Sequence, residues 1–458
     1  MSHVPDTFVG TASRQLPLLL AEDPSRVLAW RHGRAISAQQ FLAHVHAVAD
    51  KLPPAEAVVS LCTDRYAFMV AFCAAMLRGQ VTLLPSSRAP RAVDEVMATH
   101  PGCYAFGDEA LDPAPPGYWR LPDLDHLPSG DEGSQWPQIP ADQVVAIGYT
   151  SGSTALPHPS PKTWRSLHAS NAGNMGVLSE AVQGSFNIVA TVPPQHMYGV
   201  EMSVLLPLLG GHSVHCGRPL FPADVAAALA GIPAPRVLVS TPVHLRALVE
   251  SGVRLPPVAL IISATAPLSV ALARAVEEGF GAPVQEVFGS TETCVFASRR
   301  PTVSEDWQLF ADVTVQPQPD GTAVFAPQLS SAVTLADIVS VAADGRSFSL
   351  RGRRADLLEI AGKRASLSDL TRRLLAIPGV RDGVVLQLDE CDALGVQRIA
   401  ALAVAPELDA MQIIEALRRS IDPVFLPRPL RLVKVLPRNE TGKLPRTALL
   451  ALLAECNV

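Results

Sequence analysis

The sequence predicts an α/β protein with a large N-terminal domain of parallel-rich sheets and helices and a small C-terminal α+β domain. Short apolar strands alternate with helical patterns over most of the chain, which is typical of parallel sheets covered by helices. The 458 residues exceed one ordinary core at roughly 150 residues per domain. The pattern changes at Gly352, so we expect domains at residues 1–351 and 352–458.

The composition is that of a globular protein. Hydrophobic residues make up 48% of the chain and charged residues 17%, which excludes disorder. A net charge of -6 gives no electrostatic reason to bind nucleic acid. No apolar run reaches the ~20 residues of a membrane span, and the first residues lack the basic and apolar segments of a signal peptide. We therefore expect a cytoplasmic protein without a membrane span.

The elements follow from apolar periodicity and from turn and cap signals. Residues 27–36 predict a hairpin around His32-Gly33, and Ser37 begins a helix that runs to Leu52. Residues 313–350 alternate apolar and polar side chains, which favours an antiparallel, barrel-like section. Further strands are expected at residues 58–61, 81–84, 144–147, 187–192, 237–240, 259–263, 284–287, 383–388 and 399–404, and helices near residues 65–77, 166–178, 367–375 and 411–420.

A loop of glycine and hydroxyl residues follows the strand at residues 144–147. Residues 148–154 read Gly-Tyr-Thr-Ser-Gly-Ser-Thr. Glycine lets the backbone approach a ligand closely, and successive N–H groups and hydroxyls can surround a phosphate. The loop is not a Walker A sequence because no Gly-Lys-Ser/Thr closes it. Lys162 follows after a proline-rich spacer, so we interpret residues 148–162 as a phosphate site.

Polar turns also follow several of the other predicted strands. They lie at residues 193–199, 240–242, 263–268 and 288–293. Open parallel sheets bind their ligands at the carboxyl ends of the strands, where loop backbones and helix N-termini converge. We therefore expect one ligand site at this edge of the sheet.

Taken together, these segments resemble the adenylate-forming superfamily of acyl- and aryl-CoA synthetases, peptide-synthetase adenylation domains and luciferase-like enzymes. The resemblance covers nearly the whole chain, and its segments occur in the order of the family. They are residues 149–154 (phosphate loop), 288–292 (second signature), Asp337 (ribose aspartate), Gly352-Arg353 with 362–364 (entry to the small domain) and 441–443 (catalytic-lysine loop).

The resemblance implies an AMP-forming acid–thiol ligase that uses ATP and Mg2+. The acid and ATP would give an acyl-adenylate and pyrophosphate, and a thiol of CoA or of a phosphopantetheine carrier protein would then accept the acyl group after the small domain rotates. The predicted nucleotide contacts are Thr150, Ser151, Gly152, Ser153, Thr154, Lys162, Phe288, Gly289, Ser290, Asp337 and Arg353.

Three residues would support the chemistry directly, because the reaction brings two anions together and needs their charge neutralised. Glu292 offers hard oxygen ligands to Mg2+. Thr291 would hydrogen-bond the α-phosphate. Lys443, on a glycine-containing loop, is a compact mobile cation that can reach both the carboxylate and the phosphate. His196 would gate the acyl pocket or bind near the carboxylate; a structural histidine is the alternative.

Three departures from the family pattern leave a rival interpretation open. The glycine usual after the phosphate-loop threonine is Ala155, the hinge position falls on Ala355, and the lysine often found after the hinge is Glu359. A degenerate nucleotide- or acyl-binding homologue without activity would fit these changes. Retention of Glu292, Asp337 and Lys443 together argues against it, since a binding protein has no need of the lysine.

The acid substrate is predicted from the segment around His196. Amino-acid-activating relatives carry an aspartate there for the α-ammonium, whereas this chain has His196-Met197-Tyr198-Gly199. An unpaired buried ammonium would be costly. This segment and Lys162-Thr163-Trp164 resemble the hydroxybenzoate ligases of aryl-polyene and xanthomonadin pigment pathways. We expect 3- or 4-hydroxybenzoate, with a fatty or hydroxyacyl acid as the alternative. The expected pocket residues are His196, Tyr198, Ser240, Ser263, Ala264, Thr265 and Gly289.

Overall fold

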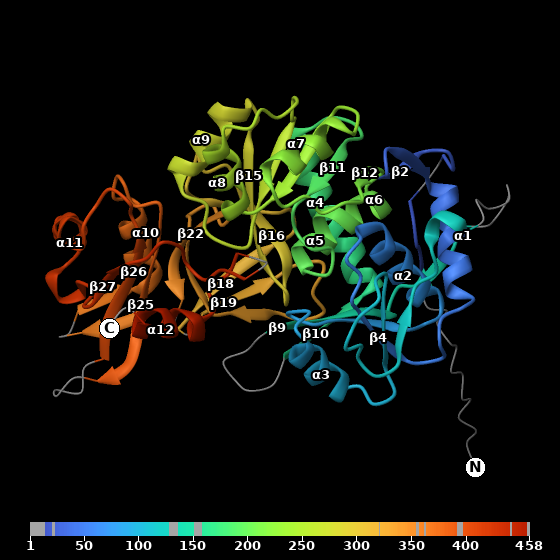
Figure 1. Cartoon of the computed structure of the whole chain (residues 1–458), viewed down its shortest axis with the longest axis horizontal. Helices are drawn as coiled ribbons and strands as arrows, with labels where there is room; N and C mark the ends of the chain where they lie inside the picture. The colour runs from blue at the N-terminus through green and yellow to red at the C-terminus, as the bar shows by residue number, and fades with distance from the viewer. Residues whose placement is uncertain are drawn as a thin grey trace, which may run out of the picture. The chain divides into compact units, whose positions relative to one another are not determined.

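The structure is a computed structural model (Figure 1). It describes residues 14–20, 23–127, 136–150, 158–319, 321–353, 357–360, 363–391, 397–439 and 442–455. The chain divides into two compact units. The first unit comprises residues 1–219, 228–236 and 290–294, and the second comprises residues 220–227, 237–289 and 295–458.

One sheet of the first unit has six strands. Its order is β10-β9-β5-β4-β6-β7, and all neighbours are parallel except the pair β9 and β10. Helix α2 is buried along almost its whole length because it is apolar on every face. The bounds are β4 (Ala57–Ser60), α2 (Arg65–Leu77), β5 (Val81–Leu84), α3 (Pro90–Ala98), β6 (Tyr104–Gly107), β7 (Tyr118–Arg120), β9 (Val144–Thr150) and β10 (His158–Thr163).

The edge strand β10 was not predicted from the sequence. It carries Pro159 and Pro161, which argue against a central strand. The two prolines occupy alternate positions on the outermost strand of the sheet, where a missing N–H costs no ladder hydrogen bond. The register pairs His158 with Thr150 and Lys162 with Ala146. Thr150 and His158, which flank the part of the predicted phosphate site outside the described residues, are therefore paired side by side.

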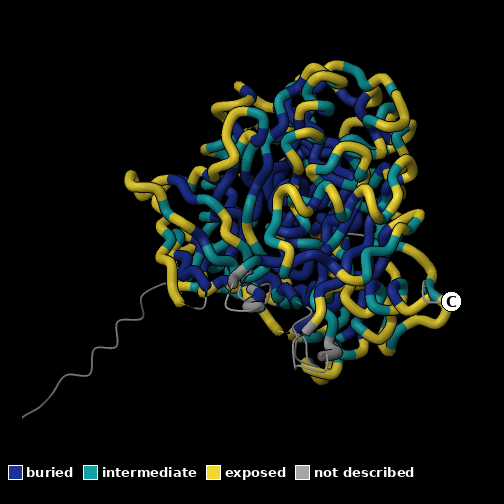
Figure 2. Tube along the Cα trace, turned by 90° about the vertical axis from the view of Figure 1, so that its left-hand side faces the viewer, coloured by how far each residue is buried: buried dark blue, intermediate teal, exposed yellow. Residues whose placement is uncertain are grey.

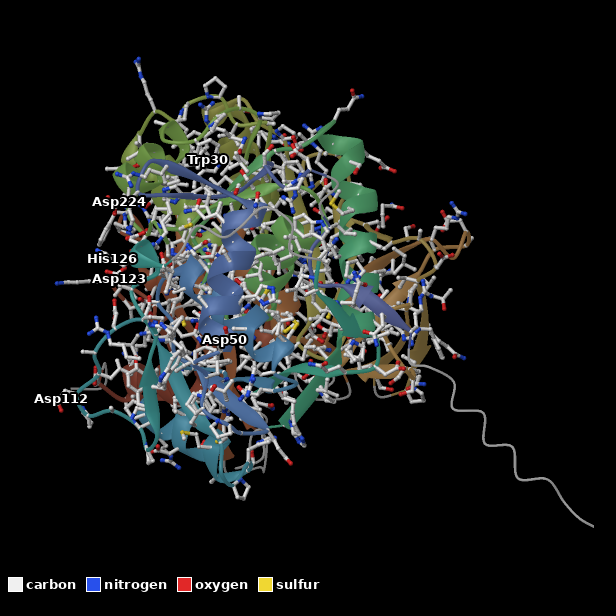
Figure 3. All side chains as sticks on the ribbon, turned by 90° about the vertical axis from the view of Figure 1, so that its right-hand side faces the viewer. Trp30, Asp50, Asp112, Asp123, His126 and Asp224 are labelled. Atoms are coloured by element: carbon white, nitrogen blue, oxygen red, sulfur yellow. The ribbon has the colours of Figure 1, made fainter. Side chains whose placement is uncertain are left out.

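Four more strands of the first unit pair in the order β11-β12-β2-β3. The indole N–H of Trp30 on β2 (Figure 3) donates to Asn187 Oδ1 and Ser213 Oγ, each at 2.8 Å, and so ties the three parallel strands together. The remaining bounds are β1 (Gln15–Pro17), β2 (Val27–Arg31), β3 (Arg34–Ser37), α1 (Ala38–Ala49), η1 (Leu124–His126), β8 (Gln138–Pro140), α4 (Trp164–Ala181), β11 (Asn187–Ala190), α5 (Met197–Val200), the π-helix η2 (Glu201–Leu205), α6 (Leu206–Leu209) and β12 (Ser213–His215).

The second unit contains strands in the order β21-β22-β17-β16-β15-β14-β13. Strands β13, β14 and β15 are parallel, and helices α8 and α9 pack against each other (Figure 1). The antiparallel section predicted at residues 313–350 is confirmed by β18 to β22. The bounds are α7 (Pro222–Ala230), β13 (Arg236–Ser240), α8 (Pro242–Ser251), β14 (Leu260–Ser263), α9 (Val270–Phe280), β15 (Val284–Ser290), β16 (Cys294–Arg299), β17 (Trp307–Leu309), β18 (Thr314–Gln318), β19 (Gly321–Phe325), β20 (Val333–Leu335), β21 (Asp337–Val341) and β22 (Ser347–Arg353).

Two hydrophobic clusters contain only residues from 358 onward. Leu374 and Ile413 lie in one of them and Leu402 and Leu453 in the other. A core of its own is what a separate C-terminal domain needs, although the boundary at residue 352 stays a prediction. The bounds are β23 (Leu357–Ile360), β24 (Lys363–Ser366), α10 (Leu367–Leu375), β25 (Asp382–Cys391), β26 (Gln397–Val404), α11 (Ala410–Arg418), η4 (Pro423–Phe425), β27 (Leu430–Leu432) and α12 (Arg446–Glu455).

The α/β class predicted from the sequence is confirmed. Strands β4 and β14 are wholly buried, as their apolar runs predict, and Figure 2 colours the buried residues dark blue. Among the residues that the structure describes, no helix is both long and apolar enough to cross a membrane.

Candidate active site

A tight turn carries the predicted metal ligand Glu292. We call residues 290–294 the carboxylate turn. The N–H of Ser290 donates to Thr293 Oγ1 at 3.0 Å, and the N–H of Thr293 donates to Ser290 Oγ at 3.2 Å. Cys294 closes the turn with a φ of 59°, a left-handed conformation that few non-glycine residues adopt. These reciprocal bonds fix the backbone from which Glu292 projects.

The Glu292 side chain is half-buried and accepts hydrogen bonds that favour its charged form. Thr150, the last residue of β9, donates its hydroxyl to Glu292 Oε1 at 3.2 Å. Burial would raise the pKa of this carboxyl, but the hydrogen bonds from Ser290 and Thr150 and the charge of Lys162 outweigh it and lower the pKa. An ionised carboxylate is what a Mg2+ ligand must be.

Glu292 would be one of few protein ligands to a metal ion. No group of three or more His, Cys, Asp or Glu side chains suited to a metal occurs in the described part of the chain. Mg2+ commonly takes one or two carboxylates and completes its shell with substrate phosphates and water. The donor set therefore fits Mg2+ that arrives with a nucleotide, and Glu292 is the residue that would hold it.

Both Thr291 and the α5 segment lie beside β9. A Cβ added at Gly148 would come within 2.6 Å of Thr291 Cγ2 and 3.6 Å of Met197 Cγ, so glycine is needed for this close approach. His196 is the N-cap residue of α5, and Tyr198 in its first turn is buried. Within the first unit, the structure thus brings together Thr291 of the second signature, the strand of the phosphate loop and the predicted acid-binding segment.

Lys162, a predicted phosphate contact, makes its described hydrogen bond within the protein. Its side chain is buried, and Nζ donates to the backbone oxygen of Glu292 at 2.7 Å. Ser151, Gly152, Ser153 and Thr154 lie outside the described residues.

In the second unit, the predicted pocket residues occupy the carboxyl ends of parallel strands. Ser240 ends β13, Ser263 ends β14, and the register places them side by side. Within the described residues, the buried Oγ of Ser263 has no hydrogen-bond partner, as is typical of a group that meets a ligand or water. Ala264 is buried, and Thr265 follows with a φ of 79°. These residues therefore lie at the carboxyl ends of parallel strands, which is where open sheets bind their ligands.

The two predicted nucleoside contacts have different surroundings. Phe288, on β15, packs against Phe296, Trp307 and Phe348 with ring centroids 5.4, 5.0 and 5.8 Å away. This cluster fixes the ring, while Gly289 after it is exposed. Asp337 begins β21, and the antiparallel register places it opposite Arg353 on β22. The pairing brings the predicted ribose carboxylate and its predicted cationic neighbour to adjacent backbone positions.

Lys443 is exposed on a turn that polar contacts hold. Its N–H donates to Asn439 Oδ1, and the N–H of Asn439 donates to the Lys443 carbonyl, each at 2.9 Å. A Cβ at Gly442 would lie 3.5 Å from Val243 Cγ2 and 3.9 Å from Thr265 Oγ1. Within the second unit, the turn that carries the predicted catalytic lysine therefore lies close to Thr265, a predicted pocket residue that is distant in the chain.

Arg438, which the sequence did not point to, connects this turn to β25. Its guanidinium donates to Asp382 through Nη2 at 2.7 Å and Nε at 3.1 Å, and through Nη1 to the carbonyl of Gly442 at 2.7 Å. A bidentate pair of this kind sets direction as well as distance.

Replacing Arg438 with methionine is expected to slow pyrophosphate release roughly 10- to 100-fold, because misplacing a catalytic group by about 1 Å costs this much. In a Lys443→Ala background the same change should have almost no further effect. Arg418→Met is the matched control, since Arg418 pairs with Glu415 on an exposed helix surface. Equal pyrophosphate release rates for the two arginine variants would show that Arg438 does not position Lys443.

Comparisons with known proteins identify the family of this chain. Residues 20–320 match the family of AMP-binding enzymes. A 4-coumarate–CoA ligase of Halorhodospira halophila is 30% identical over 311 residues, which cover 64% of this chain and 73% of that ligase. A 4-coumarate–CoA ligase of Rhodobacter capsulatus is 29% identical over 316 residues, covering 66% of this chain and 75% of the relative.

Solved structures share the fold over almost the whole chain. The AMP complex of o-succinylbenzoate CoA synthetase (MenE) from Bacillus subtilis superposes with a TM-score of 0.79 at 17% identity, covering 95% of this chain and 98% of that one. ATP-bound MatB from Rhodopseudomonas palustris gives 0.78 at 18% identity, covering 96% and 98%. ATP and Mg2+ are the cofactors expected of the matched family, and CoA is the expected acceptor. The protein accordingly couples ATP to the conversion of a carboxylic acid into an acyl-adenylate and then a thioester. The chain belongs to the AMP-binding enzyme family and is an AMP-forming acid–thiol ligase.

Proposed function

We propose that the acid is an aryl acid of the hydroxybenzoate type, such as 3- or 4-hydroxybenzoate. The observation that carries the proposal is the α5 segment, where buried Met197 and Tyr198 stand in place of a carboxylate that could hold an α-ammonium. Buried apolar and aromatic side chains suit a flat ring. The curated relatives are named for 4-coumarate, which is itself a phenolic acid.

A carboxylate does occur three positions after Tyr198. Glu201 is buried on η2, and its Oε1 accepts hydrogen bonds from Ser170 at 2.6 Å and Asn174 at 3.4 Å on α4. These contacts direct the carboxylate toward α4. An amino acid would therefore have to compete with α4 for this group, which disfavours amino-acid substrates.

In the proposed reaction the residues of the carboxylate turn and of the Lys443 turn share the neutralisation of charge. Glu292 would hold Mg2+, which offsets the negative charge of the phosphates when bound. Thr291 would donate a hydrogen bond to the α-phosphate, and Lys443 would approach the acid carboxylate and that phosphate as negative charge develops. The acyl group is then transferred to CoA. The alternative acceptor is the thiol of a phosphopantetheine carrier protein in a pigment pathway.

A pyrophosphate-release assay with ATP, Mg2+ and a panel of acids tests the proposal. The panel contains hydroxybenzoates, cinnamates, aminobenzoates, medium-chain fatty acids and amino acids. We expect release with hydroxybenzoates and little with fatty acids. Preference for a fatty acid would favour the acyl-activating alternative, and ATP binding without release for any acid would favour the degenerate binder. Adding CoA or a loaded carrier protein to a positive reaction then identifies the acceptor by mass spectrometry.

A further inference from the structure

Two side chains of the edge strand β10 hold the backbone of the carboxylate turn. Ser160 and Lys162 are two positions apart, so they project from the same face of the strand. Ser160 Oγ donates to the carbonyl of Thr291 at 3.3 Å, and Lys162 Nζ donates to the carbonyl of Glu292 at 2.7 Å. Consecutive carbonyl groups of the second signature are thus bound by alternate residues of one strand.

The burial of Lys162 distinguishes this contact from a surface interaction. Only 4% of the residue is exposed. Burying an ammonium group is costly unless it is hydrogen-bonded, and the bond it then makes is stronger than in water. A lysine that neutralises the phosphates of an incoming nucleotide would instead keep its Nζ accessible. The observed geometry therefore favours a contact that is made within the protein.

We propose that Lys162 is a positioning residue, which fixes the backbone at Glu292 so that its carboxylate is presented beside Thr150, and that it does not contact the nucleotide phosphates. The proposal rests on the proposed function only in taking Glu292 as the Mg2+ ligand. Groups that orient a metal ligand typically account for roughly 10- to 100-fold in metal affinity. Lys162 would be an orienting group of this kind, although it binds the backbone carbonyl of Glu292 and not the carboxylate itself.

The first test measures the turn itself, without catalysis. Amide hydrogen exchange of Ser290 and Thr293, whose N–H groups bond within the turn, is compared between the wild-type protein and Lys162→Met. Loss of a hydrogen bond to a charged group should speed exchange roughly tenfold or more. Lys51→Met, at an exposed lysine, is the control and should leave exchange unchanged. Unaltered protection in Lys162→Met would overturn the proposal. If Lys162→Met does not fold, Lys162→Gln keeps a neutral donor and serves in its place.

The second test is a double-mutant cycle on Mg2+-dependent ATP binding, measured by titration calorimetry. Lys162→Met alone should weaken the apparent Mg2+ affinity roughly tenfold. In a Glu292→Gln background the same change should matter less than about twofold, because the residue through which Lys162 acts is already altered. Additive effects would mean that Lys162 contacts phosphate on its own, which overturns the proposal.

The two tests separate this proposal from the proposed function. A wild-type protein that releases no pyrophosphate, but whose carboxylate turn exchanges faster in Lys162→Met, would refute the function and support the positioning role. A protein that activates hydroxybenzoates, but in which Lys162→Met and Glu292→Gln have additive effects, would support the proposed function and refute the positioning role.

Discussion

Replacing Lys443 with alanine is expected to reduce acid-dependent pyrophosphate release by roughly 100- to 1,000-fold, the usual cost of removing one group that stabilises transition-state charge. ATP affinity should change little, because the lysine is proposed to act as charge develops between the two anions. The backbone bonds to Asn439 do not involve the removed side chain, so the turn should persist. Pyrophosphate release and equilibrium ATP binding measured on the same preparation check both statements.

Two controls sharpen this prediction. Lys434→Ala removes an exposed lysine from the same C-terminal region and should leave the rate unchanged. A synthetic acyl-adenylate supplied together with CoA bypasses the first half-reaction, so Lys443→Ala should still form the thioester at a near-normal rate. Normal pyrophosphate release by Lys443→Ala would remove the lysine from the mechanism.

Glu292→Gln is the second change with a large expected effect. The variant keeps the size of the side chain and the hydrogen bond from Thr150 but removes the charge. Loss of a direct ligand should cost at least as much as loss of an orienting partner, roughly 10- to 100-fold in apparent Mg2+ affinity. Pyrophosphate release titrated with Mg2+ should therefore need far more metal to reach half its maximum.

The control for this prediction is Glu180→Gln, an identical chemical change at an exposed position of α4. Its Mg2+ titration should superpose on that of the wild-type protein. Excess Mg2+ should restore part of the rate of Glu292→Gln, whereas it should not restore Lys443→Ala. An unchanged Mg2+ requirement in Glu292→Gln would place the metal ligand elsewhere.

Much of the fold could be predicted because local signals and tertiary structure agree. The hairpin at His32 and Gly33, where both residues have positive φ, and the Ser37 cap of α1 follow from residue types at fixed positions. The strand ends at Ser240 and Ser263 follow from the general rule for parallel sheets. These features need no knowledge of distant partners.

Other features depend on contacts that one sequence does not reveal. The prolines of β10 argue against a strand, and only the position of β10 at the sheet edge makes the strand possible. Lys162 follows a loop of glycine and hydroxyl residues, which led us to predict a phosphate contact. Its spacing of two positions from Ser160 would have indicated that both side chains project from the same face of a strand. The pair of Arg438 with Asp382 joins residues 56 positions apart, and the sequence offers no signal for it.

Strand β10 also bears on the behaviour of the protein in concentrated solution. An unprotected edge strand can pair with the edge of another molecule and so begin aggregation. The outer side of β10 carries Pro159 and Pro161, whose nitrogen atoms have no hydrogen to donate. A foreign strand would find carbonyl acceptors without the alternating donors that an antiparallel ladder requires. The two prolines of β10 therefore discourage intermolecular sheet growth at this edge.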